Sequence, residues 1–193
     1  MARAAYSILE LLVCLSLALV VSGAGAPVLL AARDGIRADG AADFLVSQLH
    51  SARMEALKRR AHVAIRFEPD GDDYVLAFYV DGNGNGVRAT DITSGVDVLL
   101  RPRQPLRDQF AGVRFGFEDG VPDVDGTATL ENRDPIRVGR SRMLSFSPTG
   151  TSSTGTVYLH GRGRRQLAVR VLGGTGRIRS LGFDFGARAW VPR

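Results

Sequence analysis

The sequence predicts an α+β protein in which one long N-terminal helix packs on a mostly antiparallel β-sheet. Two observations predict this class: helical apolar patterns fill about the first 60 residues, and short alternating strand patterns separated by turn residues fill the rest. With 193 residues, of which 45% are hydrophobic, the chain can form one domain of ordinary size and an N-terminal appendage. We expect an apolar helix over 6–32, an amphipathic continuation over 33–60 and a β-rich domain over 61–193.

The N-terminal segment has the length and composition of a membrane-spanning helix. No charged residue occurs from Leu11 to Ala32, and a helix of these 22 residues would be roughly 33 Å long, enough to cross the hydrocarbon core of a bilayer. Arg3 precedes this segment and favours a cytoplasmic start, with the rest of the chain sent outward. Glu10 stands at the start of the apolar segment, where burying a carboxylate without a partner costs a few kcal/mol or more.

A cleaved secretory signal is one explanation of this segment. Ala24-Gly25-Ala26 fits the small-residue pattern of a cleavage site, and the product would be a secreted periplasmic β-domain. Pro27 directly after the cut and Glu10 near the apolar region disfavour it. A plain membrane anchor explains the length of the segment but not its carboxylate.

The stretch "AYSILELLVCLSLALVV" resembles the class III leader of type IV pilins and type II secretion pseudopilins. The resemblance implies a leader of residues 1–5, cut by a prepilin peptidase between Ala5 and Tyr6, with Tyr6 as the N-methylated first residue. The family usually has Gly and Phe where this chain has Ala5 and Tyr6. Glu10 then matches the family's glutamate, which in a filament would pair with the terminal amine of a neighbouring subunit and set the axial register.

Residues after the apolar segment predict a helix that is weakened and then amphipathic. Gly23, Gly25 and Pro27 are expected to interrupt or kink the helix, and Pro27 matches a proline common in pilins. Small and medium residues then recur every three or four positions, on the face that we expect to dock on the sheet: Ala38, Ala42, Leu45, Leu49, Ala52 and Ala56.

The run "ADFLVSQLHSARMEALKRRAHVAIRF" narrows the resemblance. It is similar to the GspH/FimT group of minor pilins and pseudopilins, whose members carry an "AR.EA.KR…V" pattern where the helix passes into the first strand. The resemblance implies a non-catalytic filament subunit in the bacterial inner membrane, with its globular domain in the periplasm. Its partners would be the prepilin peptidase and other pilins or pseudopilins, in type II secretion or in type IV pilus biogenesis.

Strand patterns follow the helix. "HVAIRF" and "YVLAFYV" flank the turn "PDGDD" and predict a hairpin. We expect the stretch 108–134, rich in Gly and Asp, to be a long exposed loop. Further strands are expected over 96–100, 113–117, 143–146, 156–159, 166–172 and 177–185.

The loop "DGNGNG" begins like a calcium-binding loop of the EF-hand type. Asp81, Asn83 and Asn85 have the spacing of the first ligands, but Ile92 stands where the bidentate Glu belongs. A turn between strands explains the same residues, because Asn and Gly tolerate positive φ. Weak calcium binding and a simple turn both remain open, and we expect no other cofactor.

Charge is distributed unevenly along the chain. Residues 1–136 hold 14 Lys or Arg against 19 Asp or Glu, whereas residues 137–193 hold 11 Arg against one acid, Asp184. Such a basic third suggests an anionic partner or a solvated basic face.

Arginines in this basic third repeat at a spacing of two residues, which on a strand would present guanidinium groups on one side. Gly176-Arg177-Ile178-Arg179 resembles the G-R-x-R signature of FimT-like minor pilins of DNA uptake, where it contacts double-stranded DNA. Ordinary strand alternation explains the same spacing. The sequence shows no nucleophile elbow, phosphate-binding loop or paired carboxylates, so we expect no catalytic residue. The candidate DNA-binding residues are Arg140, Arg142, Arg162, Arg164, Arg165, Gly176, Arg177 and Arg179.

Overall fold

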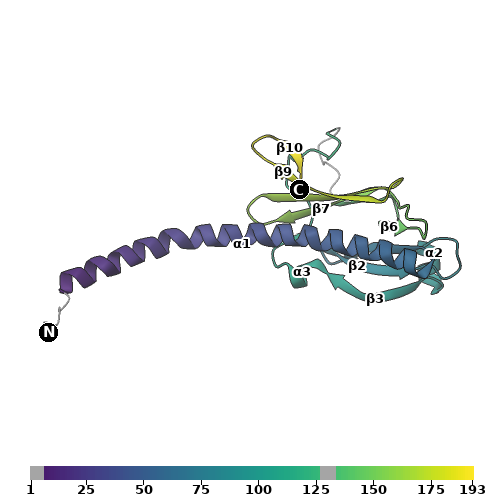
Figure 1. The fold of residues 1–193 in the computed structure, drawn as a ribbon, viewed down its shortest axis with the longest axis horizontal. Coiled ribbons are helices and arrows are strands. Elements are labelled where there is room, and N and C mark those ends of the chain that lie inside the picture. The colour runs from purple at the N-terminus through teal and green to yellow at the C-terminus, as the bar shows by residue number, and fades with distance from the viewer. Residues whose placement is uncertain (1–6, 127–133) are drawn as a thin grey trace.

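The computed structural model describes residues 7–126 and 134–193, and of residues 24–27 it describes only the helical backbone. A helix of 52 residues, α1 (Ile8–Arg59), dominates the molecule, and its N-terminal half projects beyond the sheets (Figure 1). The side chain of Ser7 caps its first turn by accepting a hydrogen bond from the Leu9 N–H. Arg60 ends the helix in the left-handed conformation, with φ of 54°.

The predicted interruption at Gly23–Pro27 does not occur. α1 is one continuous helix through these residues, and Figure 1 shows it curving gradually in this half. A proline removes one helical hydrogen bond and displaces one carbonyl, but the bonds on both sides continue the helix.

The first sheet has the strand order β3-β2-β1-β6, and all of its pairs are antiparallel. The predicted hairpin is confirmed, since Val63 pairs with Val80 and Asp70 with Asp73 around a turn at Gly71 and Asp72. The strands are β1 (Val63–Asp70), β2 (Asp73–Val80), β3 (Val98–Pro105) and β6 (Met143–Phe146).

The second sheet has the order β10-β9-β8-β7-β4, with β5 also paired to β7, and is again antiparallel. The sequence predicted one sheet without this division, and it missed the short elements β5, β10, α2 (Ala89–Ser94) and α3 (Leu106–Gln109). The strands are β4 (Arg114–Phe115), β5 (Ile136–Arg137), β7 (Gly155–Gly161), β8 (Arg165–Leu172), β9 (Arg177–Asp184) and β10 (Ala189–Pro192).

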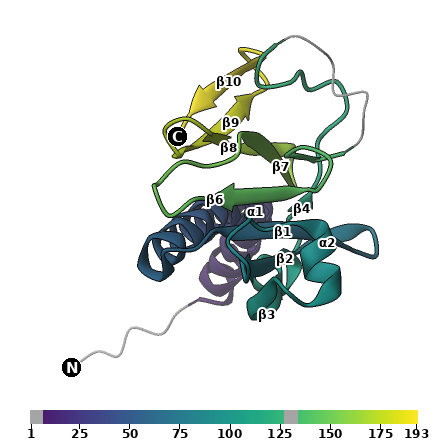
Figure 2. The same cartoon turned by 90° about the vertical axis from the view of Figure 1, so that its right-hand side faces the viewer.

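The main core lies where the C-terminal half of α1 meets both sheets, which flank it in Figure 2. The predicted stripe is confirmed, because every one of its six residues is fully buried, together with Ala41. Ile65 and Phe67 of the first sheet and Val157 and Val169 of the second pack in the same cluster. Burial of this face is what fixes α1 on the sheets.

The prediction of a long exposed loop over 108–134 is wrong in part, because several apolar residues of its described part are buried while residues such as Asp119 and Gly120 are exposed. Val113 and Phe115 enter the main core, and Val121 joins a second cluster around Tyr158 on the opposite face of the second sheet. Trp190 packs on that cluster and donates a hydrogen bond from Nε1 to the Pro122 carbonyl. The apolar residues of this segment are buried in the two clusters, and this burial holds the segment against the sheets despite the Gly and Asp residues around them.

Candidate functional site

The N-terminal half of α1 is an unusual surface because its apolar side chains are exposed. Leu and Val side chains over 9–21 and 28–30 are half to three-quarters exposed, and none contacts the sheets closely enough to be buried. Glu10 lies in the first turn, and within the part of the chain that the structure describes it makes no ion pair. By length and composition α1 is apolar enough to cross a membrane. Ala5 and Tyr6 lie outside the described residues.

Arg177 and Arg179 are the candidate pair that the structure places on a strand. Both lie on β9, are exposed and share the outer face of the second sheet. Arg179 stands opposite Arg170 of β8 in the register, and Arg170 pairs with Asp125 at 2.6 Å. Neither Arg177 nor Arg179 makes a salt bridge over residues 7–126 and 134–193. These two guanidinium groups are thus open to an anionic partner.

Gly176 of the G-R-x-R motif has a structural reason of its own. Its φ is +60°, a conformation that side chains disfavour, and an added Cβ would lie 2.6 Å from the Gly150 carbonyl oxygen. Arg53 of α1 donates from Nη1 to the Gly176 carbonyl at 3.2 Å. The glycine is therefore needed to tie the β8–β9 turn to α1, whatever the arginines bind.

The other spaced arginines do not form rows on strands, so that interpretation is wrong for them. Arg140 and Arg142 lie in the turn before β6, and Arg162 and Arg164 lie in the loop between β7 and β8. Gly139 and Gly163 have positive φ, as do Arg142 and Arg164 themselves, and this conformation belongs to turns.

Two of these turn arginines are held by the protein. Arg142 forms a two-pronged ion pair with Asp134, at 3.0 Å from Nε and 2.8 Å from Nη2, and lies over the Tyr74 ring. The Asp134 carboxylate raises the pKa of Arg142 by hydrogen bonding to its guanidinium group. This guanidinium group is therefore already paired within the protein. Arg164 stacks on Phe185 at 4.5 Å, with Glu118 at 3.8 Å.

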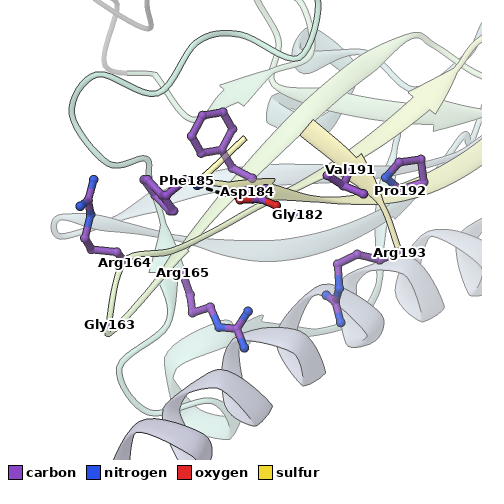
Figure 3. A pocket seen from close by; sticks show the side chains of 11 residues that line it. Gly163, Arg164, Arg165, Gly182, Asp184, Phe185, Val191, Pro192 and Arg193 are labelled. Atoms are coloured by element: carbon purple, nitrogen blue, oxygen red, sulfur yellow. Dashed lines mark hydrogen bonds between the residues drawn. The ribbon is translucent and has the colours of Figure 1, made fainter. Parts of the chain in front are cut away.

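Arg165 and Arg193 point toward α1 from the rim of a hollow of about 690 Å³ (Figure 3). Arg193 pairs with Asp39 at 3.3 Å. The Arg165 guanidinium lies so close to α1 that a Cβ on Gly35 would be 2.8 Å from its Nη2. The sequence has no local signal of this contact, because it joins residues that only the tertiary fold brings together.

The DGNGNG loop closes on its own side chains. The Asp81 carboxylate accepts hydrogen bonds from the N–H groups of Asn83, Gly84 and Gly86, and the amide groups of Asn83 and Asn85 donate to Asp91. Burial opposes ionisation of Asp81, but these three N–H groups outweigh it and lower its pKa. No group of three His, Cys, Asp or Glu with the geometry of a metal site occurs among the described residues. This geometry is that of a well-bonded turn, and calcium binding stays a prediction.

The fold is of the predicted α+β class. One half of its long apolar helix is exposed, and the other half is docked on antiparallel sheets. Comparison with protein families matches residues 41–175 to the family described as "Type II transport protein GspH". The match spans well over half of the chain, so the chain belongs to the GspH family, and the resemblance found in the sequence is confirmed.

Among solved structures the chain is similar to the "Structure of the minor pseudopilin EpsH from the Type 2 Secretion System of Vibrio cholerae". The two share 18% sequence identity with a TM-score of 0.46, over 76% of this chain and 97% of that chain. No curated protein matches the chain.

Proposed function

We propose that the chain is a minor pseudopilin, a non-catalytic subunit of a type II secretion filament. The observation that carries the proposal is the exposed apolar half of α1 with Glu10 at its start, in a member of the GspH family. An exposed face of this length in water would be strongly unfavourable, so it needs lipid or neighbouring helices around it. Assembly in type IV pilus biogenesis would use the same helix and is the related alternative.

In this proposal the chain is inserted in the bacterial inner membrane with its globular domain in the periplasm. The prepilin peptidase cuts between Ala5 and Tyr6, and the new amino group of Tyr6 is methylated. Subunits then leave the membrane and pack through the apolar half of α1 around the filament axis. Glu10 of one subunit pairs with the terminal amine of its neighbour, because an unpaired carboxylate in an apolar bundle costs several kcal/mol.

The test is Glu10→Gln, which keeps the shape of the side chain and removes its charge. We expect membrane insertion to persist and incorporation into filaments, measured by shearing and immunoblotting, to fall at least tenfold. Glu55→Gln is the matched control, since Glu55 pairs with Arg59 on the surface of the docked half of α1. Filaments that contain Glu10→Gln at the parental level would contradict the proposal.

N-terminal sequencing of the mature chain separates this proposal from a secreted periplasmic β-domain. A methylated start at Tyr6 supports the filament subunit. A start near Pro27 would mean ordinary signal cleavage, and the apolar half of α1 would then be absent from the mature protein.

Double-stranded DNA binding is a second candidate function, favoured by the exposed pair Arg177 and Arg179. Two guanidinium groups on one strand face suit phosphate oxygens, and each phosphate contact contributes about 0.9 to the slope of log affinity against log salt. Arg177→Ala/Arg179→Ala should therefore weaken duplex binding and lower that slope by about 1.8. Duplex binding equal to that of the parent would remove this candidate.

A further inference from the structure

The loop between β7 and β8 lies against α1 close to the point where the apolar segment ends. Gly161 approaches Ala38 so closely that an added Cβ would be 2.8 Å from the Ala38 Cβ. The Arg165 guanidinium lies on α1 beside Gly35, and Figure 3 shows its side chain directed at the helix. Small residues on both elements permit this approach and fix the position of the loop along α1.

This position can be compared with the depth of a bilayer. Ala32 is the last residue of the uncharged run, and Gly35 follows it by three residues, which is about 4.5 Å along a helix axis. The polar headgroup layer on each side of a bilayer is about 5–7 Å thick. When the uncharged run spans the hydrocarbon core, the Arg165 guanidinium therefore lies at the level of the lipid phosphates.

Carboxylates around the loop neutralise some of its arginines but not all. Arg37 pairs with Asp34 at 3.5 Å, Arg193 with Asp39 and Arg164 with Glu118. In the described parts of the chain, no carboxylate forms a salt bridge with three further arginines around this loop, Arg33, Arg162 and Arg165. The same holds for Arg188, which lines a neighbouring hollow with Arg164. Arg162 is exposed and packs its stem on Gly112.

We propose that the β7–β8 loop is a lipid-binding surface, on which Arg162 and Arg165, together with Arg33, bind the phosphates of anionic lipids. The proposal rests on the membrane insertion of α1 proposed above. Guanidinium groups bind phosphate oxygens through paired hydrogen bonds, and anionic lipids add attraction for each basic residue near the surface. Together with α1 this contact fixes the height and the rotation of the globular domain on the membrane before assembly.

The molecule contains its own control for this proposal. β8 runs from Arg165 to Leu172, about 23 Å at the usual rise per residue, and Leu172 pairs with Arg177. Arg177 and Arg179 therefore lie at the end of the β8–β9 hairpin that is remote from the membrane. Removing either pair changes the net charge of the chain equally.

The experiment titrates the detergent-solubilised full chain with phosphatidylglycerol or phosphatidylcholine and counts bound lipids by native mass spectrometry. We expect the parent to prefer phosphatidylglycerol. Each arginine near an anionic surface contributes about fivefold, so Arg162→Gln/Arg165→Gln should weaken phosphatidylglycerol binding by about 25-fold. Arg177→Gln/Arg179→Gln should bind within twofold of the parent, and Arg162→Lys/Arg165→Lys should retain most of the affinity because the charge remains.

Several outcomes would overturn the proposal. The first is phosphatidylglycerol binding by Arg162→Gln/Arg165→Gln that equals that of the parent. The second is an equal loss of affinity in both glutamine variants, which would mean that net charge alone, and not this loop, determines lipid binding. Duplex DNA binding that is lost only in Arg162→Gln/Arg165→Gln would assign the loop to nucleic acid instead. Thermal unfolding checks that the glutamine pair still folds, and the lysine pair tests charge independently.

Failure of this proposal is distinct from failure of the proposed function. Membrane insertion and filament incorporation are measured on the same variants. A chain that inserts and assembles without lipid preference would contradict only the proposed lipid-binding surface. A chain cleaved near Pro27 would lack the membrane-spanning half of α1, and both proposals would then fail.

Discussion

The two halves of α1 belong to one continuous helix and yet present opposite surfaces. In the N-terminal half the leucines and valines are exposed, with Leu19 67% exposed. In the C-terminal half the side chains of one face are small and fully buried, and Leu45 and Leu49 fill the space between two sheets. The docked half is buried within one chain, whereas the apolar surface of the other half is covered by none of the residues that the structure describes.

Helix formation and helix burial are therefore specified separately in this protein. The exposed half has apolar residues on all sides, which is the pattern of a helix in lipid or in a bundle. The docked half has an apolar stripe on one face, which is the pattern of a helix on a sheet. Substitutions in the docked half should change folding of the globular domain, and substitutions in the exposed half should not.

The largest expected effect comes from truncating a leucine in each half. Leu49→Ala should destabilise the globular domain by about 3 kcal/mol, because it removes buried methyl groups and leaves a cavity. For a chain of this size the melting temperature should fall by about 6–12 °C. Leu19→Ala should change the free energy of unfolding of the globular domain by no more than about 0.5 kcal/mol. Thermal and denaturant unfolding of the full chain in detergent measures both, and equal losses would contradict the separation of the two halves.

A smaller effect should come from the close approach of the second sheet to the docked half. Gly161→Ala places a Cβ 2.8 Å from that of Ala38 and should destabilise the domain by about 1–3 kcal/mol, because neither backbone can move without disturbing its neighbours.

Gly174→Ala is the control for that substitution, since it lies in the next hairpin turn with nothing within 4 Å of its added Cβ. If the two glycine variants unfold at the same denaturant concentration, the docking of α1 does not depend on this close contact.

The sequence specified α1 and its docking face well, because a helical period repeated over many residues is a strong signal. The strand 143–146 was predicted with its observed bounds. β4 lies within the predicted strand 113–117, but β5 has only two residues, too few for an alternating pattern. The division into two sheets depends on pairings between distant strands.

The candidate site could be predicted only in part, for a similar reason. Glu10, Arg177 and Arg179 were proposed from local signals, an isolated charge and an alternation on a strand, together with the family resemblance, and their roles stay predictions. The R-x-R spacing alone cannot distinguish a strand from a turn. Gly163 and Arg164 have positive φ, so the pair Arg162 and Arg164 lies in a loop. The approach of Arg165 to Gly35 joins segments far apart in the sequence and had no local signal.

The smallest expected effect concerns a cluster outside the α1 core. Asp123 accepts a hydrogen bond from the Tyr158 hydroxyl at 2.5 Å and forms an ion pair with Arg137 at 2.9 Å. Burial opposes ionisation of Asp123, but these partners outweigh it and lower its pKa, while burial and the neighbouring carboxylate raise the pKa of Tyr158.

Because the pKa of Asp123 is lower in the folded state, the stability that it contributes is present above its unfolded pKa of about 3.9 and is lost as the pH falls through the folded value. Asp123→Asn should cost about 1–2 kcal/mol at pH 7 and reduce the loss of stability below pH 4. Asp119→Asn, an exposed carboxylate in the preceding turn, should change neither. Urea unfolding at pH 7 and pH 3.5 measures the difference. An unchanged acid dependence in Asp123→Asn would mean that the second cluster adds no acid-sensitive stability and that other carboxylates with a lowered pKa, such as Asp81, govern acid unfolding.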